Sequence, residues 1–218
     1  MDKLYEKMLL ALQNHDKETA VKLAMSALED ELVDIVTLYE DVLTPVLNSV
    51  VEEFRDEDTL IWQEHTRSEI VISIIENSYT YVLKERDKLG IINGEEVMLI
   101  SPKYEDHIIG SKMAANIFTI AGYKTIFIGA NAPWNAALKA IENKKPKYIS
   151  LSFSNFYNTV AARKTIASIK EEFDYGIKFI LAGYALRNDK NLYKEIGGDI
   201  YIESLRDIFS IGKDVSNK

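Results

Sequence analysis

The stretch "SPKYEDHIIGSK" (Ser101–Lys112) places one of the chain's three histidines between a predicted strand and a predicted helix. The segment before it, "EEVMLI", is typical of a buried strand, and a helical apolar pattern begins near Gly110. Glu105 and Asp106 directly precede His107. A metal-ligating imidazole usually gives its second N–H to a carboxylate, and a glycine lets a bulky group approach the backbone. The pattern E-x-H-x-x-G therefore has two readings, a ligating histidine or an ordinary loop histidine ahead of a helix.

The half of the chain around this stretch alternates short apolar runs with helical segments, which predicts a five-stranded, doubly wound parallel sheet of the Rossmann-like kind. In such sheets ligands bind beyond the carboxyl ends of the strands, where His107 is expected. The chain contains neither G-x-G-x-x-G nor G-K-[ST], so a phosphate cradle is not expected. We expect strands at 97–101, 124–129, 148–153, 178–183 and 199–203, in a domain spanning 95–214.

The N-terminal part has a different composition. Its first 85 residues contain no glycine and a single proline, Pro45, which favours helices. Apolar residues recur at helical spacing, which predicts a four-helix bundle as a first domain, 1–88, with a kink or break at Pro45. The four helices are expected at 4–12, 17–32, 33–54 and 58–86.

Composition narrows the classes of function. The chain has no cysteine, which excludes disulfides, thiolate metal sites and cysteine nucleophiles. Its formal charge of −8 disfavours direct nucleic-acid binding, and no apolar run is long enough to span a membrane. No signal peptide is evident at the start, so we expect a cytoplasmic protein.

A helical bundle followed by E-x-H-x-x-G on the first strand loop resembles the cobalamin-binding domain family, whose usual pattern is D-x-H-x-x-G. The resemblance implies base-off binding, with His107 as the lower cobalt ligand, Glu105 as the orienting acid and Asp106 beside them. Gly110 is the position of close approach to the cofactor. The slot for the displaced nucleotide tail is placed at Ser150, Ser152, Ser154, Ala182 and Gly183.

The bundle most resembles that of the light-sensing cobalamin repressors, which carry W-x9-E-H over the upper cobalt face. Here Phe54 stands for the tryptophan, followed at the same spacing by Glu64 and His65. The resemblance implies a photoreceptor-like regulator that binds adenosylcobalamin, with methylcobalamin as a second possibility. The DNA-binding module of the repressors is not seen, so signalling is expected through a homo-oligomer or a partner protein.

Two alternatives to this sensor remain open. One is a corrinoid methyl carrier of a methyltransferase system, and the other is a scaffold that no longer binds a cofactor. No nucleophile–base pair stands out in the chain, so the sequence favours a non-enzymatic sensor, and any chemistry would be that of the cofactor.

Overall fold

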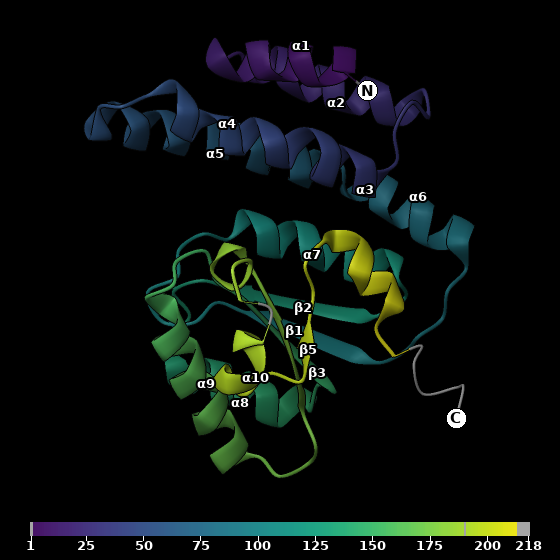
Figure 1. The fold of residues 1–218 in the computed structure, drawn as a ribbon. Helices are drawn as coiled ribbons and strands as arrows, with labels where there is room; N and C mark the ends of the chain where they lie inside the picture. Colours follow the sequence, from purple (N-terminus) through teal and green to yellow (C-terminus); the bar gives the residue numbers. More distant parts are fainter. Residues whose placement is uncertain (1, 190, 213–218) are drawn as a thin grey trace. The chain divides into compact units, whose positions relative to one another are not determined.

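The computed structural model describes residues 2–189 and 191–212, and the chain forms two compact units, Met1–Leu89 and Gly90–Lys218 (Figure 1). We call them the helical unit and the sheet unit. The two domains predicted from the sequence, 1–88 and 95–214, stay a proposal as functional domains, and residues 213 and 214 of the second lie outside the described part.

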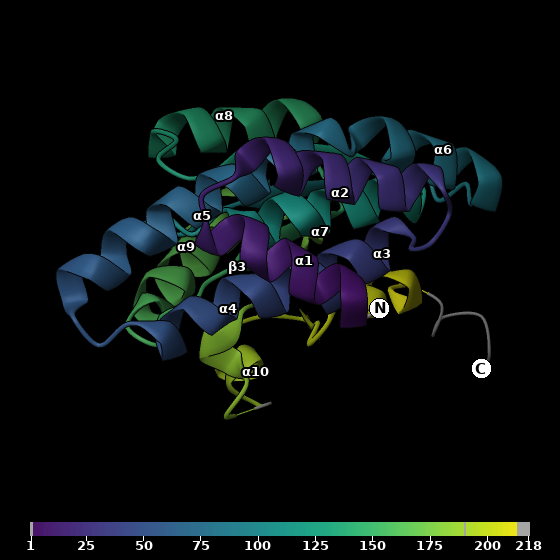
Figure 2. The ribbon, with the colours of Figure 1, turned by 90° about the horizontal axis from the view of Figure 1, so that it is seen from above.

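The helical unit is built from amphipathic helices whose starts are capped by acids. The Asp16 side chain accepts a hydrogen bond from the Thr19 N–H (2.9 Å), and Asp56 accepts one from Thr59 (2.9 Å). Helix α1 packs beside α2, and α2 and α4 pack against α5 (Figure 2). The elements are α1 (Asp2–Gln13), α2 (Lys17–Glu29), α3 (Ile35–Thr37), the π-helical η1 (Leu38–Leu43), α4 (Thr44–Glu53), α5 (Glu57–Asn77) and α6 (Tyr79–Leu89).

Two local features differ from the predicted bundle. The break expected at Pro45 takes the form of η1, where the Thr44 N–H bonds to the Tyr39 carbonyl five residues back and the helix continues. The predicted helix 58–86 is wrong, because it is divided into α5 and α6 at Ser78. The Ser78 hydroxyl donates to the Ile75 carbonyl (2.8 Å) and pairs with the buried Tyr39 hydroxyl (2.6 Å), so it serves side-chain packing at the bend.

The sheet unit contains a parallel sheet with strand order β2-β1-β3-β4-β5, as the doubly wound prediction requires. Strands β1 and β3 are neighbours, and the order of the strands reverses between them. This is the topological switch point, where loops leave adjacent strands in opposite directions. The strands are β1 (Glu96–Ile100), β2 (Lys124–Gly129), β3 (Tyr148–Ser152), β4 (Lys178–Ala182) and β5 (Ile200–Tyr201).

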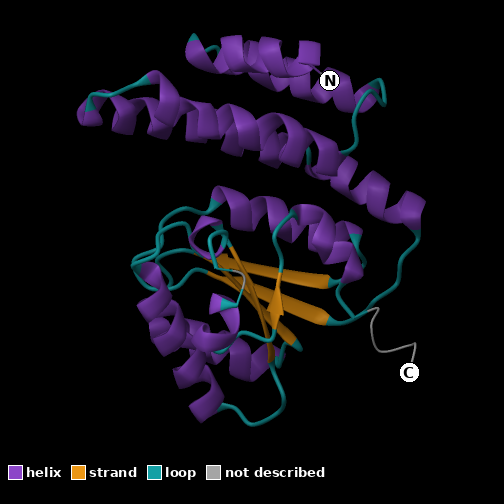
Figure 3. Ribbon diagram, viewed as in Figure 1, coloured by secondary structure: helices purple, strands orange, loops and turns teal. Residues whose placement is uncertain are grey.

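Helices cover both faces of this sheet (Figure 3). Helix α7 (Ile109–Ile120) and the 3₁₀ segment η3 (Leu205–Ser210) lie together on one face. The other face packs against α8 (Trp134–Lys144), α9 (Asn158–Glu172) and α10 (Leu192–Ile196), beside the short η2 (Tyr184–Leu186). The sequence "SLRDIFSIG" (204–212) predicts a last helix, and its helical part, Leu205–Ser210, is a 3₁₀ segment. In the described parts of the chain, no helix combines the length and apolarity needed to cross a bilayer.

Candidate functional site

Two loops at the switch point are tied together by one buried acid. The β1 loop (residues 101–108) carries Glu105, whose side chain is fully buried, and the β3 loop (residues 153–157) carries Ser154. The Ser154 N–H donates to Glu105 Oε2 (2.8 Å), and the Ser154 hydroxyl lies 3.2 Å from both carboxylate oxygens. Asn158, at the start of α9, donates to the same Oε2 (3.0 Å).

Glu105 also holds the histidine of its own loop. It accepts hydrogen bonds from the His107 N–H (3.0 Å) and from His107 Nδ1 (2.6 Å). Burial alone would raise the pKa of this carboxyl, but the hydrogen bonds from His107, Ser154 and Asn158 outweigh burial and lower the pKa to about 2. The acid is therefore an ionised acceptor at neutral pH.

The arrangement sets the tautomer of His107. An ionised carboxylate can only accept, so Nδ1 carries the proton and Nε2 carries the lone pair suited to a metal. The side chain of His107 is 64% exposed although its partner Glu105 is buried. Glutamate in place of the usual aspartate therefore still reaches the histidine, and it reaches the β3 loop as well.

The donor set fits a metal that arrives with most of its ligands already in place. Among the described residues, no cluster of three or more histidine, cysteine or acidic side chains could hold a free metal ion. A metal already held by a macrocycle needs only one axial side chain from the protein, as haem iron does. A single oriented imidazole suits cobalt in a corrin in the same way.

Other predicted positions surround this pair. Gly110 has open space where a Cβ would stand, so its lack of a side chain is not required by protein packing. Asp106 is exposed and accepts a hydrogen bond from Asn131 in the loop after β2 (2.9 Å). The hydroxyl of Ser101, at the end of β1, is buried without a hydrogen-bond partner in the described structure.

The predicted tail slot lies on β3, β4 and the turns that follow them. Ser152 and Ala182 pair with each other in the last register position of the two strands, and Ser150 is buried in β3. The backbone of the fold itself requires a glycine at position 183. Its φ is +115°, and a Cβ there would lie 2.1 Å from the Phe153 carbonyl oxygen, so only glycine allows the two turns to pass this closely.

The predicted residues of the helical unit are less tightly organised. Phe54 follows α4, while Glu64 is half-buried and His65 is exposed on α5. Phe54 lies against Arg67, whose guanidinium carbon is 5.6 Å from the ring centroid. Arg67 is 1% exposed and forms a bidentate pair with Glu53 (2.7 and 2.8 Å), whose carboxyl pKa it lowers.

Sequence reasoning did not find Asn158, Asn131 or the Glu53–Arg67 pair. Each partner is far away in the chain, and no local pattern marks it. The one available signal was the segment "SNFYN" after β3, whose serine and asparagines place a hydroxyl and amides at the edge where His107 was expected.

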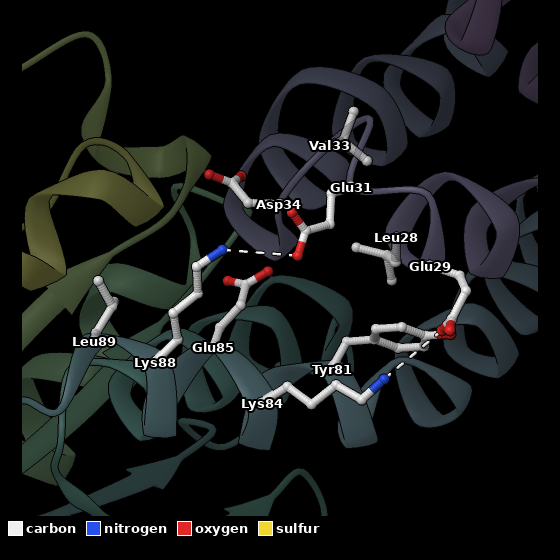
Figure 4. A pocket seen from close by; sticks show the side chains of 10 residues that line it. All are labelled: Leu28, Glu29, Glu31, Val33, Asp34, Tyr81, Lys84, Glu85, Lys88 and Leu89. Carbon is white, nitrogen blue, oxygen red and sulfur yellow. Dashed lines mark hydrogen bonds and ion pairs between the residues drawn. The ribbon is translucent and has the colours of Figure 1, made fainter.

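A hollow of about 530 Å³ in the helical unit holds none of the predicted site residues (Figure 4). Its charged walls largely pair with one another, as in the Lys84–Glu29 and Lys88–Glu31 ion pairs. The Glu85 carboxylate accepts the Ile35 N–H (2.7 Å) at the start of α3. These groups are therefore engaged in contacts within the helical unit.

Comparison with known families gives a match to one part of the chain. Residues 4–77 match the family model of the B12 binding domain. This match covers most of the helical unit and confirms the predicted resemblance to the cobalamin-binding domain family. It also supports cobalamin as the cofactor class.

Curated relatives align over nearly the whole chain. The chain is 25% identical over 201 residues to trimethylamine corrinoid protein 1 of Methanosarcina mazei, covering 92% of this chain and 91% of the relative. It is 24% identical over 208 residues to the protein of the same name from Methanosarcina acetivorans, again covering 92% and 91%.

Solved structures share the fold. The monomethylamine corrinoid protein of Methanosarcina barkeri matches with a TM-score of 0.80 at 16% identity, over 98% of this chain and 99% of that one. A cobalamin-binding protein of Desulfitobacterium hafniense matches with a TM-score of 0.54 at 15% identity, over 95% and 96%. The helical cap plus Rossmann-like architecture predicted from the sequence is confirmed.

The comparisons correct the predicted function. The sensory and regulatory assignment is wrong, because the curated relatives that align over nine tenths of this chain are trimethylamine corrinoid proteins. The photoreceptor-like and non-enzymatic expectations lose their support together with it. The corrinoid methyl carrier, held open as an alternative, agrees with these relatives.

Proposed function

We propose that the chain is a corrinoid protein that carries a methyl group within a methyltransferase system. The observation that carries the proposal is the buried Glu105 holding the mostly exposed His107 at the switch point of the sheet. The names of the relatives support the same reading and make methylated amines the first methyl donors to test.

In this proposal each residue of the sheet unit has a physical task. His107 holds cobalt through Nε2, and Glu105 fixes the tautomer and ring orientation. Gly110 leaves room for the cofactor, while Ser150, Ser152, Ser154, Ala182 and Gly183 line the tail slot. When bound, cobalamin supplies a cobalt ion that can accept a methyl group and give it up.

The remaining assignments follow from the family resemblance. The helical unit is the cap domain and the sheet unit the cofactor-binding domain, with Asp106, Phe54, Glu64 and His65 as further cofactor contacts. The partners of a carrier are the methyltransferases that load and unload it. The predicted homo-oligomer and the cytoplasmic location stay predictions, the first open to light scattering.

The histidine assignment is tested by cobalamin retention. The protein is incubated with hydroxocobalamin, passed through a desalting column and assayed for retained corrinoid by absorbance. We expect His107→Ala to lose the histidine-ligated spectrum and to retain at least about ten-fold less cofactor, because metal affinity depends on the neutral imidazole ligand. The matched control is His15→Asn, since His15 has a φ of +54° that asparagine tolerates.

A second measurement distinguishes the proposed methyl carrier from the rejected assignment as an adenosylcobalamin sensor. Titrations with methylcobalamin and adenosylcobalamin in the dark should show methylcobalamin binding at least as tightly as the adenosyl form. A His107→Ala variant with unchanged retention would contradict the site. A strong preference for adenosylcobalamin would contradict the carrier.

A further inference from the structure

Three aromatic side chains on the β1 and β3 loops face solvent. Tyr104 is 75% exposed, Phe156 63% and Tyr157 83%. At 150–250 Å² for each aromatic side chain, they expose on the order of 450 Å², comparable to the largest apolar patches of ordinary monomers. Exposed apolar surface of this size, where it is contiguous, marks a binding surface.

The three side chains stand on loops that are fixed to each other. Asn158 Nδ2 donates to the Tyr104 carbonyl oxygen (3.5 Å) as well as to the Glu105 carboxylate (3.0 Å). The Tyr157 N–H donates to Asn155 Oδ1 (2.9 Å), which closes the turn that precedes α9. The aromatic residues therefore sit on ordered backbone beside the buried acid.

Tyr104 stands in a backbone conformation that favours glycine. Its φ is +70°, and the turn is closed by the Glu105 N–H donating to the Pro102 carbonyl (3.1 Å). A non-glycine residue held there costs about 1–2 kcal/mol, and strain of this kind is typically kept at ligand sites. Glycine would adopt this turn without strain, so the tyrosine ring is not required by the backbone conformation and points to a binding role.

We propose that Tyr104, Phe156 and Tyr157 form an aromatic rim that packs against the corrin macrocycle of the bound cofactor. The inference rests on the proposed function, because it assumes cobalt at His107. His107 lies three positions after Tyr104, so their Cα atoms are at most about 11 Å apart. A broad, flat macrocycle centred near His107 extends over its neighbours, and small-molecule sites are lined mainly by aromatic and apolar side chains.

The test uses variants in which stability and affinity change in opposite directions. Tyr104→Gly relieves the φ strain, so the sheet unit should be at least as stable as in the wild type. The same variant should bind hydroxocobalamin about three- to ten-fold more weakly, since it loses one packed ring. Tyr104→Gly combined with Phe156→Ala and Tyr157→Ala should lose about ten-fold or more. Tyr175→Ala, a 37% exposed tyrosine in the turn between α9 and β4, is the matched control.

Affinity is read from the quenching of protein fluorescence on titration with hydroxocobalamin, and stability from urea unfolding of the same preparations. A triple variant that binds as tightly as wild type overturns the rim and leaves a partner protein as the occupant of this surface, while the proposed function stands. Wild-type protein that binds no hydroxocobalamin overturns the proposed function and the rim with it. Loss of affinity in Tyr175→Ala equal to that of the triple variant also overturns the rim.

Discussion

Replacing Glu105 with glutamine tests the central interaction of the site in the protein without cofactor. The folded site lowers the carboxyl pKa from its ordinary 4.5 to about 2. Relative to the unfolded chain, folding therefore stabilises the ionised form over the protonated form by about 3 kcal/mol. A neutral amide of the same shape resembles the protonated form and also turns an N–H₂ group toward donors. We therefore expect Glu105→Gln to lower the free energy of unfolding of the sheet unit by about 3 kcal/mol.

The two tryptophans of the chain allow the units to be followed separately. Trp62 belongs to the helical unit and Trp134 begins α8 of the sheet unit, so a Trp62→Phe background leaves a single reporter on the sheet unit. Urea unfolding followed by this fluorescence gives the free energy of that unit. Asp106→Asn is the control, because Asp106 is exposed and should cost less than about 1 kcal/mol. A Glu105→Gln variant within about 0.5 kcal/mol of its parent would refute the reasoning.

Three further predictions concern stability. Gly183→Ala should destabilise the sheet unit by about 2 kcal/mol or more. Gly110→Ala, which meets open space in a helix, should stabilise that unit by about 0.5–1 kcal/mol and yet weaken hydroxocobalamin binding. Equal stability of the two variants in urea would contradict the difference between the two glycines. Glu53→Gln should destabilise the helical unit by about 3 kcal/mol, because it leaves the buried guanidinium charge of Arg67 without a partner. Arg67→Met should destabilise it less, since it removes the buried charge itself. The reverse order in urea unfolding would contradict this account of the pair. Burial raises the pKa of Glu85 above its ordinary 4.5, so the folded protein binds this proton more strongly than the unfolded chain does. The resulting stability is present below about pH 4.5 and is lost as pH rises, so Glu85→Gln should become more favourable relative to the wild type with increasing pH. A difference between the two proteins that does not change with pH would argue against this.

The order of strands and helices in the sheet unit could be predicted because each element carries a local signal. Period-two and period-3.6 apolar patterns fall on separate segments, and turn residues divide them. In the helical unit the patterns run on without glycine, so nothing in the sequence marked the division of 58–86 at Ser78. That division depends on the hydroxyl of Tyr39, which is 39 residues away.

The candidate site shows the same limit. His107, Glu105 and Gly110 lie within six consecutive residues and could be singled out together, since their spacing carries the chemistry. Asn158 could not be found this way, because its relation to Glu105 exists only once β1 and β3 are paired. The function was misassigned for a related reason. Phe54, Glu64 and His65 form a short local pattern like that of the repressors, whereas the likeness to corrinoid proteins is spread thinly over nearly the whole chain.

Glu105 is held by Ser154 and Asn158, which lie 49 and 53 positions later in the chain and are therefore synthesised after it. At about 5–20 residues per second, the ribosome synthesises the β1 loop roughly 3–10 seconds before Ser154 and Asn158. During that interval the loop has only its own turn to hold it, while the N-terminal helices can already fold. Loading with cofactor should therefore be a post-translational event. A nascent chain halted before the start of α9 would carry His107 but would be unable to hold it in place.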